Sequence, residues 1–280
     1  MTKQTITLPG GHEMAYWTYH DNKRPTLIMV HGFTGSHEGF QYLVPLLADF
    51  RLIIPDLPGF GESPLPHEKL NLSELGTLFV DFVQTLSLDE KPYLVGHSMG
   101  SLVVSEAIRQ HPEIFEKKVV LASPVPSPVG ILDARKIGVL LSKLYYSASH
   151  RLPFLGPHLA TSHKLTRLST KMIMTTKDKL LKQTIYAHHF RNLEFISSIG
   201  WYKRLYKEIN KTGISRYRHA LKPFTTLIIV GNRDSVTPLK KQKRASQKIR
   251  AELITIPGVG HLSHYEKPAG LATAISQFLK

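Results

Sequence analysis

Three residues far apart in the chain have the side chains that a serine-based attack on a carbonyl carbon requires: Ser98, Asp234 and His261. A serine hydroxyl is a poor nucleophile near neutral pH, and it needs an adjacent base to remove its proton. A histidine serves as this base when a carboxylate holds its ring in the correct tautomer. The sequence therefore predicts a hydrolytic triad if the fold brings these three side chains together.

Ser98 lies at the centre of Gly96-His97-Ser98-Met99-Gly100, which is a G-x-S-x-G pattern. The pattern follows an apolar run at Tyr93 to Val95 and precedes a helical run at Leu102 to Gln110. A sharp strand-to-helix turn leaves no room for side chains two positions before and after the serine, so glycine is a steric requirement there. The residue pattern alone is also compatible with an ordinary tight glycine turn. Their position between a strand and a helix favours a nucleophile.

The predicted acid and base each follow a later strand. Asp234 ends the loop after the apolar run Leu227 to Val230, and His261 ends a glycine-containing loop after Leu253 to Ile256. Both would then lie at the carboxyl edge of a parallel sheet, where active sites of such sheets gather.

Both assignments have competitors. Asp234 could instead cap the helix that begins after Pro238, or pair with Arg233. His264 is an alternative base, but Gly258 and Gly260 favour His261.

A tetrahedral intermediate needs two hydrogen-bond donors directed at its oxyanion. The backbone N–H of Met99, at the start of a helix, is one candidate. The backbone N–H of Phe33 is the other, because the loop His31 to Gly35 also follows a strand and Gly32 lets its backbone turn inward. Gly32, Phe33 and His97 are the predicted walls of the substrate pocket, although an ordinary loop remains the alternative for residues 31–35.

Short apolar runs alternate with helical patterns, which is typical of a parallel sheet covered on both faces. The pattern predicts helices at Leu72 to Leu86, Leu102 to Gln110, Lys240 to Arg250 and Ala269 to Leu279. Asn71 or Ser73 is suited to cap the first of these, and Pro268 to begin the last. The predicted strands are Thr5 to Leu8, Met14 to Tyr19, Leu27 to Val30, Leu52 to Pro55, Tyr93 to Val95, Val119 to Leu121, Leu227 to Val230 and Glu252 to Ile256.

The positive charge is concentrated in one segment. Between Asp133 and Lys222 there are 18 Lys and Arg against four Asp and Glu, whereas the formal charge of the whole chain is +15. The prolines at 124, 126 and 128 cannot pair in a central strand, and helical patterns follow at Ile131 to Tyr146 and Leu193 to Ile209. The sequence predicts a body at residues 1–127 and 223–280 and a basic helical cap, or lid, at residues 128–222.

In this order, the motifs resemble the α/β-hydrolase family, in particular the capped serine hydrolases that include carboxylesterases, monoacylglycerol-lipase-like enzymes and carbon–carbon bond hydrolases. The resemblance runs from about Thr5 to Leu279. It implies an α/β fold with a mostly parallel eight-stranded sheet, helices on both faces and a helical cap inserted after the sixth strand. The motifs that carry it are His31-Gly32-Phe33, Asp56 to Ser63, Gly96 to Gly100, Gly231-Asn232-Arg233-Asp234 and Gly260-His261.

We therefore expect a serine hydrolase that cleaves a small-molecule carboxylic ester, with lipid-like or acyl substrates among the candidates, through an acyl-serine intermediate. The alternatives are a carbon–carbon bond hydrolase, whose relatives more often have Asn where His97 stands, a cofactor-free haloperoxidase-type relative, and a ligand-binding protein without activity. Relatives with Asp as nucleophile, the epoxide hydrolases and haloalkane dehalogenases, are disfavoured by Ser98.

The remaining expectations concern partners and location. The cap could contact an anionic membrane through its bases, whereas no motif predicts nucleic-acid binding. The sequence has no cysteine and no spacing typical of metal ligands, and neither a metal nor a cofactor is expected. Because the first residues lack the layout of a secretory signal and no long apolar stretch occurs, a cytoplasmic protein is predicted. The sequence leaves the oligomeric state open.

Overall fold

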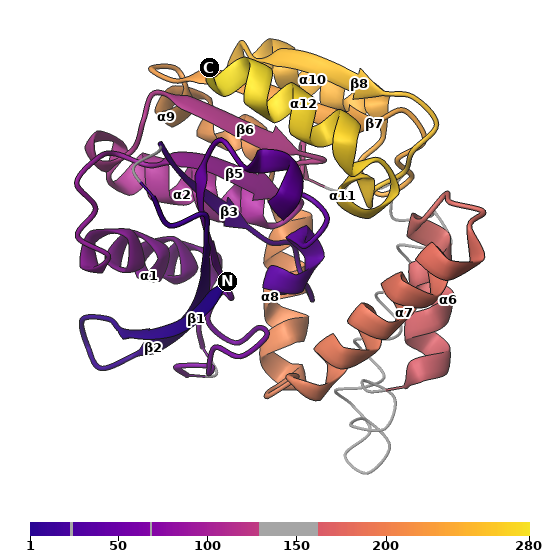
Figure 1. Ribbon diagram of the computed structural model, residues 1–280, viewed down its shortest axis with the longest axis horizontal. Helices are drawn as coiled ribbons and strands as arrows, with labels where there is room; N and C mark the ends of the chain where they lie inside the picture. The colour runs from indigo at the N-terminus through magenta and orange to yellow at the C-terminus, as the bar shows by residue number, and fades with distance from the viewer. Residues whose placement is uncertain (23–24, 68, 129–161) are drawn as a thin grey trace.

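The computed structural model describes residues 1–22, 25–67, 69–128 and 162–280. In this part of the chain eight strands form one sheet, in the order β1-β2-β4-β3-β5-β6-β7-β8 (Figure 1). β2 pairs antiparallel with β1 and with β4, and every other neighbouring pair is parallel, so the predicted mostly parallel sheet is confirmed. The strands are β1 (Thr2–Thr7), β2 (Glu13–Tyr19), β3 (Thr26–Val30), β4 (Arg51–Pro55), β5 (Tyr93–His97), β6 (Lys118–Ala122), β7 (Thr225–Gly231) and β8 (Glu252–Ile256).

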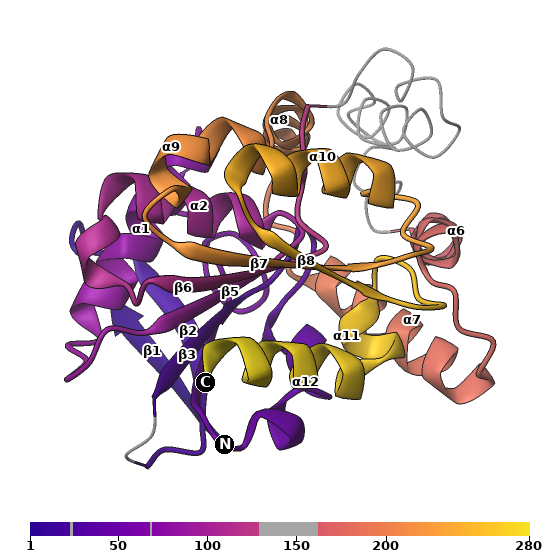
Figure 2. The same cartoon turned by 90° about the horizontal axis from the view of Figure 1, so that it is seen from above.

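Helices cover both faces of the sheet (Figure 2). One face packs against α1 (Leu72–Thr85), α2 (Gly100–Gln110) and α10 (Leu239–Ile249), and the other against α12 (Pro268–Leu279). β3 is buried at every position because it lies in the middle of this sandwich. Coverage on two sides is the reason that the central strands are continuous apolar runs rather than alternating ones.

Helices α1 and α12 begin next to the capping residue and the proline that the sequence predicts for them. Asn71 caps α1, because its side chain accepts a hydrogen bond from Glu74 N at 3.0 Å while Glu74 Oε2 accepts one from Asn71 N at 2.9 Å. This reciprocal pair is a capping box, so the cap is Asn71 rather than Ser73. Pro268 begins α12, where its missing N–H costs no helical hydrogen bond.

A helical insertion follows β6 and ends before β7, as the sequence predicts. In the described residues it contains α6 (His163–Ile173), α7 (Lys179–Glu194) and α8 (Ile199–Lys211). Its two ends run side by side, because Ile214 N donates to Val125 O at 2.8 Å and Ser215 N to Pro126 O at 3.4 Å. The short helices η4 (Ile214–Tyr217) and α9 (Arg218–Leu221) then pack against α2. The helix predicted at residues 131–146 lies outside the described residues.

The single helix predicted at Leu193 to Ile209 is two helices in the structure. α7 ends at Glu194, and Ser198 caps the start of α8 by accepting a hydrogen bond from Trp201 N at 3.2 Å. A serine favours a helix start over a helix interior, since its hydroxyl satisfies a free backbone N–H there. The break redirects the chain so that Trp201 is buried against the body. None of the described helices combines the length and the apolar character needed to cross a membrane.

Candidate active site

Ser98 occupies a strained turn between β5 and α2. Its φ is +51°, which is a left-handed backbone conformation that a residue with a side chain adopts at an energetic cost. Ser98 N donates to Ala122 O at 3.0 Å, which fixes the turn against β6. A Cβ at Gly100 would lie 2.2 Å from Val30 O, and one at Gly96 would lie 2.7 Å from Gly100 O. The steric requirement for both glycines therefore comes from backbone that cannot move aside.

The three predicted triad side chains meet in one line of hydrogen bonds. His261 Nε2 lies 3.0 Å from Ser98 Oγ, and His261 Nδ1 lies 2.9 Å from Asp234 Oδ2. Because a carboxylate oxygen accepts, the proton of a neutral His261 ring is on Nδ1, and Nε2 is left to accept the proton of Ser98. Asp234 and His261 are buried, whereas Ser98 is half-buried and so remains open to a reactant.

The loop after β7 holds Asp234 in its ionised form. Val236 N and Thr237 N each donate to Asp234 Oδ1 at 2.8 Å, and Thr237 Oγ1 donates to Oδ2 at 2.6 Å. Burial would raise the pKa of Asp234, but the charge and hydrogen bond of His261, with the bonds from Thr237, outweigh it and hold the pKa well below its usual range. Asp234 thus orders its own turn and reaches His261 as well. The N-cap of α10 is Pro238, not Asp234.

His97 and His264 lie behind His261. The His97 and His264 rings are 4.3 Å apart between centroids, and His97 Nε2 lies 3.2 Å from His261 O. Burial, together with repulsion from His261, lowers the pKa of His97 to about 3, so its neutral ring donates the Nε2 proton to that carbonyl. The structure brings His261 rather than His264 to Ser98. His97 supports the histidine loop from behind, and its part in a pocket wall stays a prediction.

The loop after β3 lies directly against Ser98. A Cβ added to Gly32 would be 3.1 Å from Ser98 Cβ, so Gly32, the residue before Phe33, packs closely against the nucleophile. His31 holds this loop, because its Nδ1 donates to Gly32 O at 2.8 Å and its Nε2 accepts from Leu57 N at 3.0 Å. Met99, on the other side of Ser98, is buried immediately before the first turn of α2.

Aromatic rings from the body and the cap surround the side chain of Phe33. Its ring centroid lies 5.9 Å from that of Phe60, 5.5 Å from that of Tyr202 and 5.9 Å from that of Tyr206. The two tyrosines belong to α8, and Tyr202 OH donates to Gly59 O at 3.0 Å. Phe60 and Tyr202 are buried, whereas Phe33 and Tyr206 are half-buried, so the insertion completes an aromatic cluster around Phe33. Sequence reasoning did not find these tyrosines, because the insertion carries no motif.

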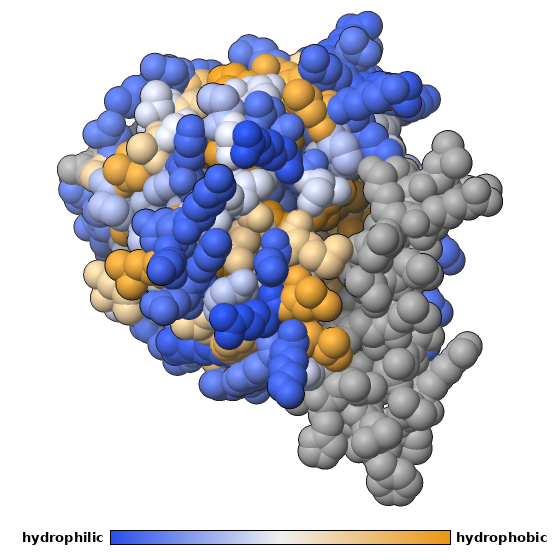
Figure 3. Space-filling view, turned by 90° about the vertical axis from the view of Figure 1, so that its right-hand side faces the viewer, coloured by the Kyte–Doolittle hydropathy of each residue, from blue (hydrophilic) through white to orange (hydrophobic). Residues whose placement is uncertain are grey.

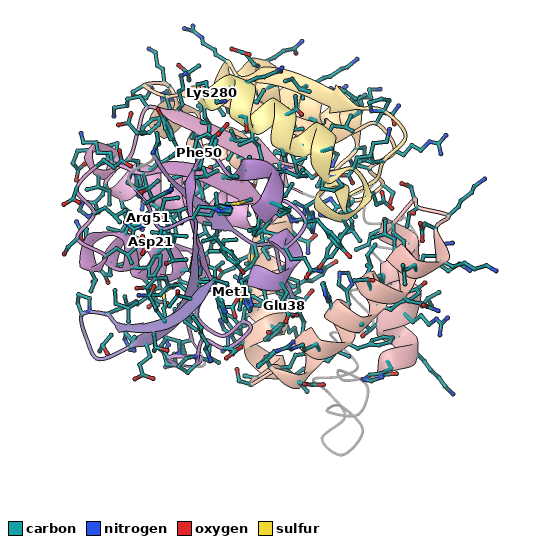
Figure 4. All side chains as sticks on the ribbon, viewed as in Figure 1. Met1, Asp21, Glu38, Phe50, Arg51 and Lys280 are labelled. Carbon is teal, nitrogen blue, oxygen red and sulfur yellow. The ribbon has the colours of Figure 1, made fainter. Side chains whose placement is uncertain are left out.

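Helix α7 is attached to the loop that follows Phe33. Arg191 Nη1 pairs with Glu38 Oε1 at 2.6 Å, and Asn192 Nδ2 donates to Thr34 O at 3.0 Å. Glu38, labelled in Figure 4, lies on the side of the body that faces α7. A shallow recess, too small to enclose a water molecule, is found at this contact, and no triad residue lines it. Its walls are Ser36, His37, Glu38, Asp56, Gly61, Glu62, Arg191 and Phe195.

Glu266 joins the insertion to the histidine loop, and no sequence motif includes it. Its Oε1 accepts from Thr175 N and from Thr176 N, the latter at 2.6 Å. Its Oε2 accepts from Thr175 Oγ1 at 2.6 Å and from Gly260 N at 3.1 Å. In addition, His261 N donates to Ile173 O at 3.3 Å. One carboxylate therefore fixes the segment between α6 and α7 against the residue that precedes His261.

Among the described residues, His, Asp and Glu side chains nowhere gather in threes as a metal ion would require.

Comparisons with known proteins agree with this fold. Uncharacterized hydrolase YugF of Bacillus subtilis is 27% identical over 285 residues, which span 96% of this chain and 95% of that protein. A bromoperoxidase structure from Bacillus anthracis matches with a TM-score of 0.81 and 20% identity over 99% of each chain. A thermophilic esterase structure from Thermogutta terrifontis matches with a TM-score of 0.78 and 20% identity, over 100% of this chain and 98% of that one. The family model described as alpha/beta hydrolase fold matches residues 25–268, and the chain therefore belongs to that family.

Proposed function

We propose that this protein is a serine hydrolase that cleaves a carboxylic ester through an acyl-Ser98 intermediate. The observation that carries the proposal is the pair of hydrogen bonds that joins Ser98 to His261 at 3.0 Å and His261 to Asp234 at 2.9 Å. A half-buried hydroxyl on a strained turn, next to a buried imidazole and a buried carboxylate, has the arrangement that nucleophilic acyl transfer needs.

In the first half of the reaction, Ser98 Oγ attacks the carbonyl carbon and its proton passes to His261 Nε2. The ring then carries a positive charge, which the ionised Asp234 stabilises through Nδ1. The carbonyl oxygen becomes an oxyanion, and the N–H groups of Met99 and Phe33 are our candidates to bind it. When the intermediate collapses, the bond to the alcohol breaks and His261 returns the proton to the leaving oxygen.

In the second half, water takes the place of the alcohol. His261 Nε2 removes a proton from water, and the hydroxide attacks the acyl carbon. The bond to Ser98 Oγ breaks, Oγ regains a proton from His261, and the carboxylic acid leaves. The half-buried rings of Phe33 and Tyr206, which lie 5.9 Å apart between centroids, favour an acyl or alcohol group with apolar character. The Thermogutta terrifontis protein of similar fold is an esterase, which agrees with this class of substrate.

A covalent probe tests the nucleophile. A fluorophosphonate should phosphonylate the folded protein once, and peptide mapping should find the adduct on Ser98. Among the described residues, only the Ser98 hydroxyl lies at hydrogen-bonding distance from a histidine that is itself paired with a carboxylate. Heat-denatured protein, which has lost that geometry, should not react. An adduct on another residue, or none on the folded protein, would overturn the proposal.

A substrate panel then distinguishes the ester from the alternatives. Chromogenic acyl esters of increasing chain length, a thioester, a lactone and a vinylogous diketone are offered to the same preparation. We expect turnover of esters, with a preference for apolar acyl or alcohol groups that can contact Phe33 and Tyr206. Turnover of the diketone alone would favour a carbon–carbon bond hydrolase. Thermal stabilisation by a ligand without any turnover would favour a binding protein.

Glu266→Gln is expected to lower kcat for an acyl ester by about tenfold or more and to reduce the free energy of unfolding by about 1–3 kcal/mol. The amide can still accept from Thr175 N and Thr176 N, but its NH2 group faces Gly260 N–H and cannot accept from it. The histidine loop therefore loses a support one residue before His261. Steady-state kinetics and urea unfolding measure the two effects.

Glu252→Gln is the matched control, since Glu252 is an exposed glutamate at the start of β8 and the substitution removes the same charge. It should leave both kcat and the free energy of unfolding nearly unchanged. If Glu266→Gln lowers stability but leaves kcat equal to that of the control, Glu266 supports the fold and does not position His261.

A further inference from the structure

Helix α6 presents an apolar stripe to solvent. Leu165, Leu168 and Met172 follow the i, i+3, i+7 spacing of one helix face, and their exposed fractions are 36%, 50% and 41%. Thr170, on the opposite side of the helix, is buried and its Oγ1 lies 2.7 Å from His189 Nδ1 of α7. The inner face of α6 is therefore occupied by the protein, and the stripe points away from it.

Two further apolar side chains extend this surface. Leu180, in the first turn of α7, is 73% exposed. Val236 is 49% exposed and follows Ser235, whose Oγ donates to Met172 O at 3.2 Å at the end of α6. With the α6 stripe, these make five of the eight large apolar side chains that are exposed in the described residues. Scattered exposed apolar residues are ordinary, but a cluster marks an interaction surface.

Positive charge surrounds the same side chains. Lys164 and Lys171 flank the stripe on α6, and Lys177 and Lys179 lie between α6 and Leu180. From His163 to Lys182 the only acidic residue is Asp178, and its Oδ1 is engaged by Leu181 N at 2.9 Å as the cap of α7. Figure 3 faces the side of the molecule on which α6 and α7 lie, where apolar patches adjoin strongly hydrophilic side chains.

We propose that the exposed face of α6, with Leu180 and Val236, docks on an anionic lipid bilayer. Apolar side chains on one stripe with lysines beside them are what an interfacial helix presents, since the apolar groups enter the headgroup boundary while the ammonium groups pair with phosphates. Val236 belongs to the loop that carries Asp234, two residues earlier. Docking would therefore bring the bilayer to the same side of the molecule as the triad loops.

The test uses the full chain with Ser98→Ala, so that binding is measured without hydrolysis of the vesicle lipid. In sedimentation at about 0.1 M salt, the protein should bind vesicles with about 30% phosphatidylglycerol at least tenfold more strongly than pure phosphatidylcholine vesicles. Lys164→Glu with Lys171→Glu should lower the partition coefficient about tenfold or more, and so should Leu168→Ser with Met172→Ser.

The control is a second basic helix. α10 carries Lys243 and Lys248 on its exposed side, but its apolar residues Ala245 and Ile249 are buried. Lys243→Glu with Lys248→Glu changes the net charge equally and should weaken binding at most twofold. An equal loss for both lysine pairs would mean that net charge alone attracts the protein, and would overturn the proposal.

Two other results would also contradict it: no sedimentation with either kind of vesicle, or retention of an RNA oligonucleotide under conditions where vesicles do not bind. In the background with Ser98 intact, the α6 variants should hydrolyse a short soluble ester like the wild type. Loss of vesicle binding is thereby separated from failure of the hydrolase proposal.

Discussion

Ser98→Ala is expected to lower kcat/KM for an acyl ester by about ten thousand- to a million-fold, with His261→Ala falling in the same range. Ser98 Oγ lies 3.0 Å from His261 Nε2, and each variant removes one of these two atoms. An alanine side chain has no group that can replace either. The double variant should be scarcely worse than either single one, because nucleophile and base act as a unit. Initial rates on a chromogenic ester, at protein concentrations high enough to measure the residual rate, provide the comparison.

Ser105→Ala is the matched control for this prediction. Ser105 lies in α2, is buried, and donates its hydroxyl to Ser101 O at 2.7 Å, far enough along the helix to leave the turn at Ser98 intact. The Ser105→Ala variant should hydrolyse the ester at a rate within about threefold of that of the wild type. Equal rates for wild type and Ser98→Ala would exclude an acyl-serine mechanism. A similar loss in both variants would mean that a serine in this helix matters for folding rather than for chemistry.

The body of the fold could be predicted from the sequence because its signals are local. The central strands are short apolar runs, and burial on both sides leaves little room for other residues, as β3 shows. The first strand is the exception. The pattern predicts it at Thr5 to Leu8, whereas it extends over Thr2–Thr7, and Ile6 is its only half-buried position. An edge strand with exposed side chains at five of its six positions gives no hydrophobic pattern to recognise.

The candidate triad could also be located from the sequence, because each residue follows a strand and parallel strands end at one edge of the sheet. What spacing could not decide is which side chains meet there. His261 and His264 are three residues apart, and only the folded loop directs one ring to Ser98 and packs the other against His97. Spacing also could not decide whether Asp234 stabilises its own turn or binds His261. In the structure it does both, because Oδ1 accepts from Thr237 N while Oδ2 contacts His261 Nδ1.

Contacts between the body and the insertion could not be predicted. Glu266 is an ordinary glutamate in the sequence, and its role as an acceptor for Thr175, Thr176 and Gly260 exists only after the insertion folds back. Likewise, Tyr202 reaches Phe33 because α8 starts anew at Ser198, whereas the apolar spacing alone suggests one longer helix. Such contacts join residues far apart in the chain, and single-sequence periodicity carries no information on them.

Asp234→Asn is expected to lower kcat by about a thousand- to ten-thousand-fold while leaving the loop folded. The asparagine oxygen can still accept from Val236 N and Thr237 N. Its NH2 group, however, faces His261 Nδ1 and donates to it, so the ring proton moves to Nε2. A protonated Nε2 cannot accept the proton of Ser98, and the nucleophile loses its base. Steady-state kinetics measure the loss, and urea unfolding verifies the fold.

The matched control is Asp178→Asn, because Asp178 also accepts a backbone N–H, from Leu181 at 2.9 Å, but caps α7. Hydrolysis of a short ester should be nearly unaffected by it, so equal losses in the two variants would contradict a specific role for Asp234.

The same substitution of Asp234 has a consequence for the pH dependence of stability. The pKa of Asp234 is lower in the folded protein than in the unfolded chain, where an aspartate has an ordinary pKa of about 3.9. As the pH falls towards and below that ordinary pKa, the unfolded chain therefore binds more protons than the folded protein. The stabilisation from this carboxylate is therefore complete above that value and is lost progressively as pH falls further. The difference in unfolding free energy between wild type and Asp234→Asn should shrink as pH falls below about pH 4. A difference that stays constant across that acid range would mean that the carboxylate gains nothing from its contacts with His261 and Thr237.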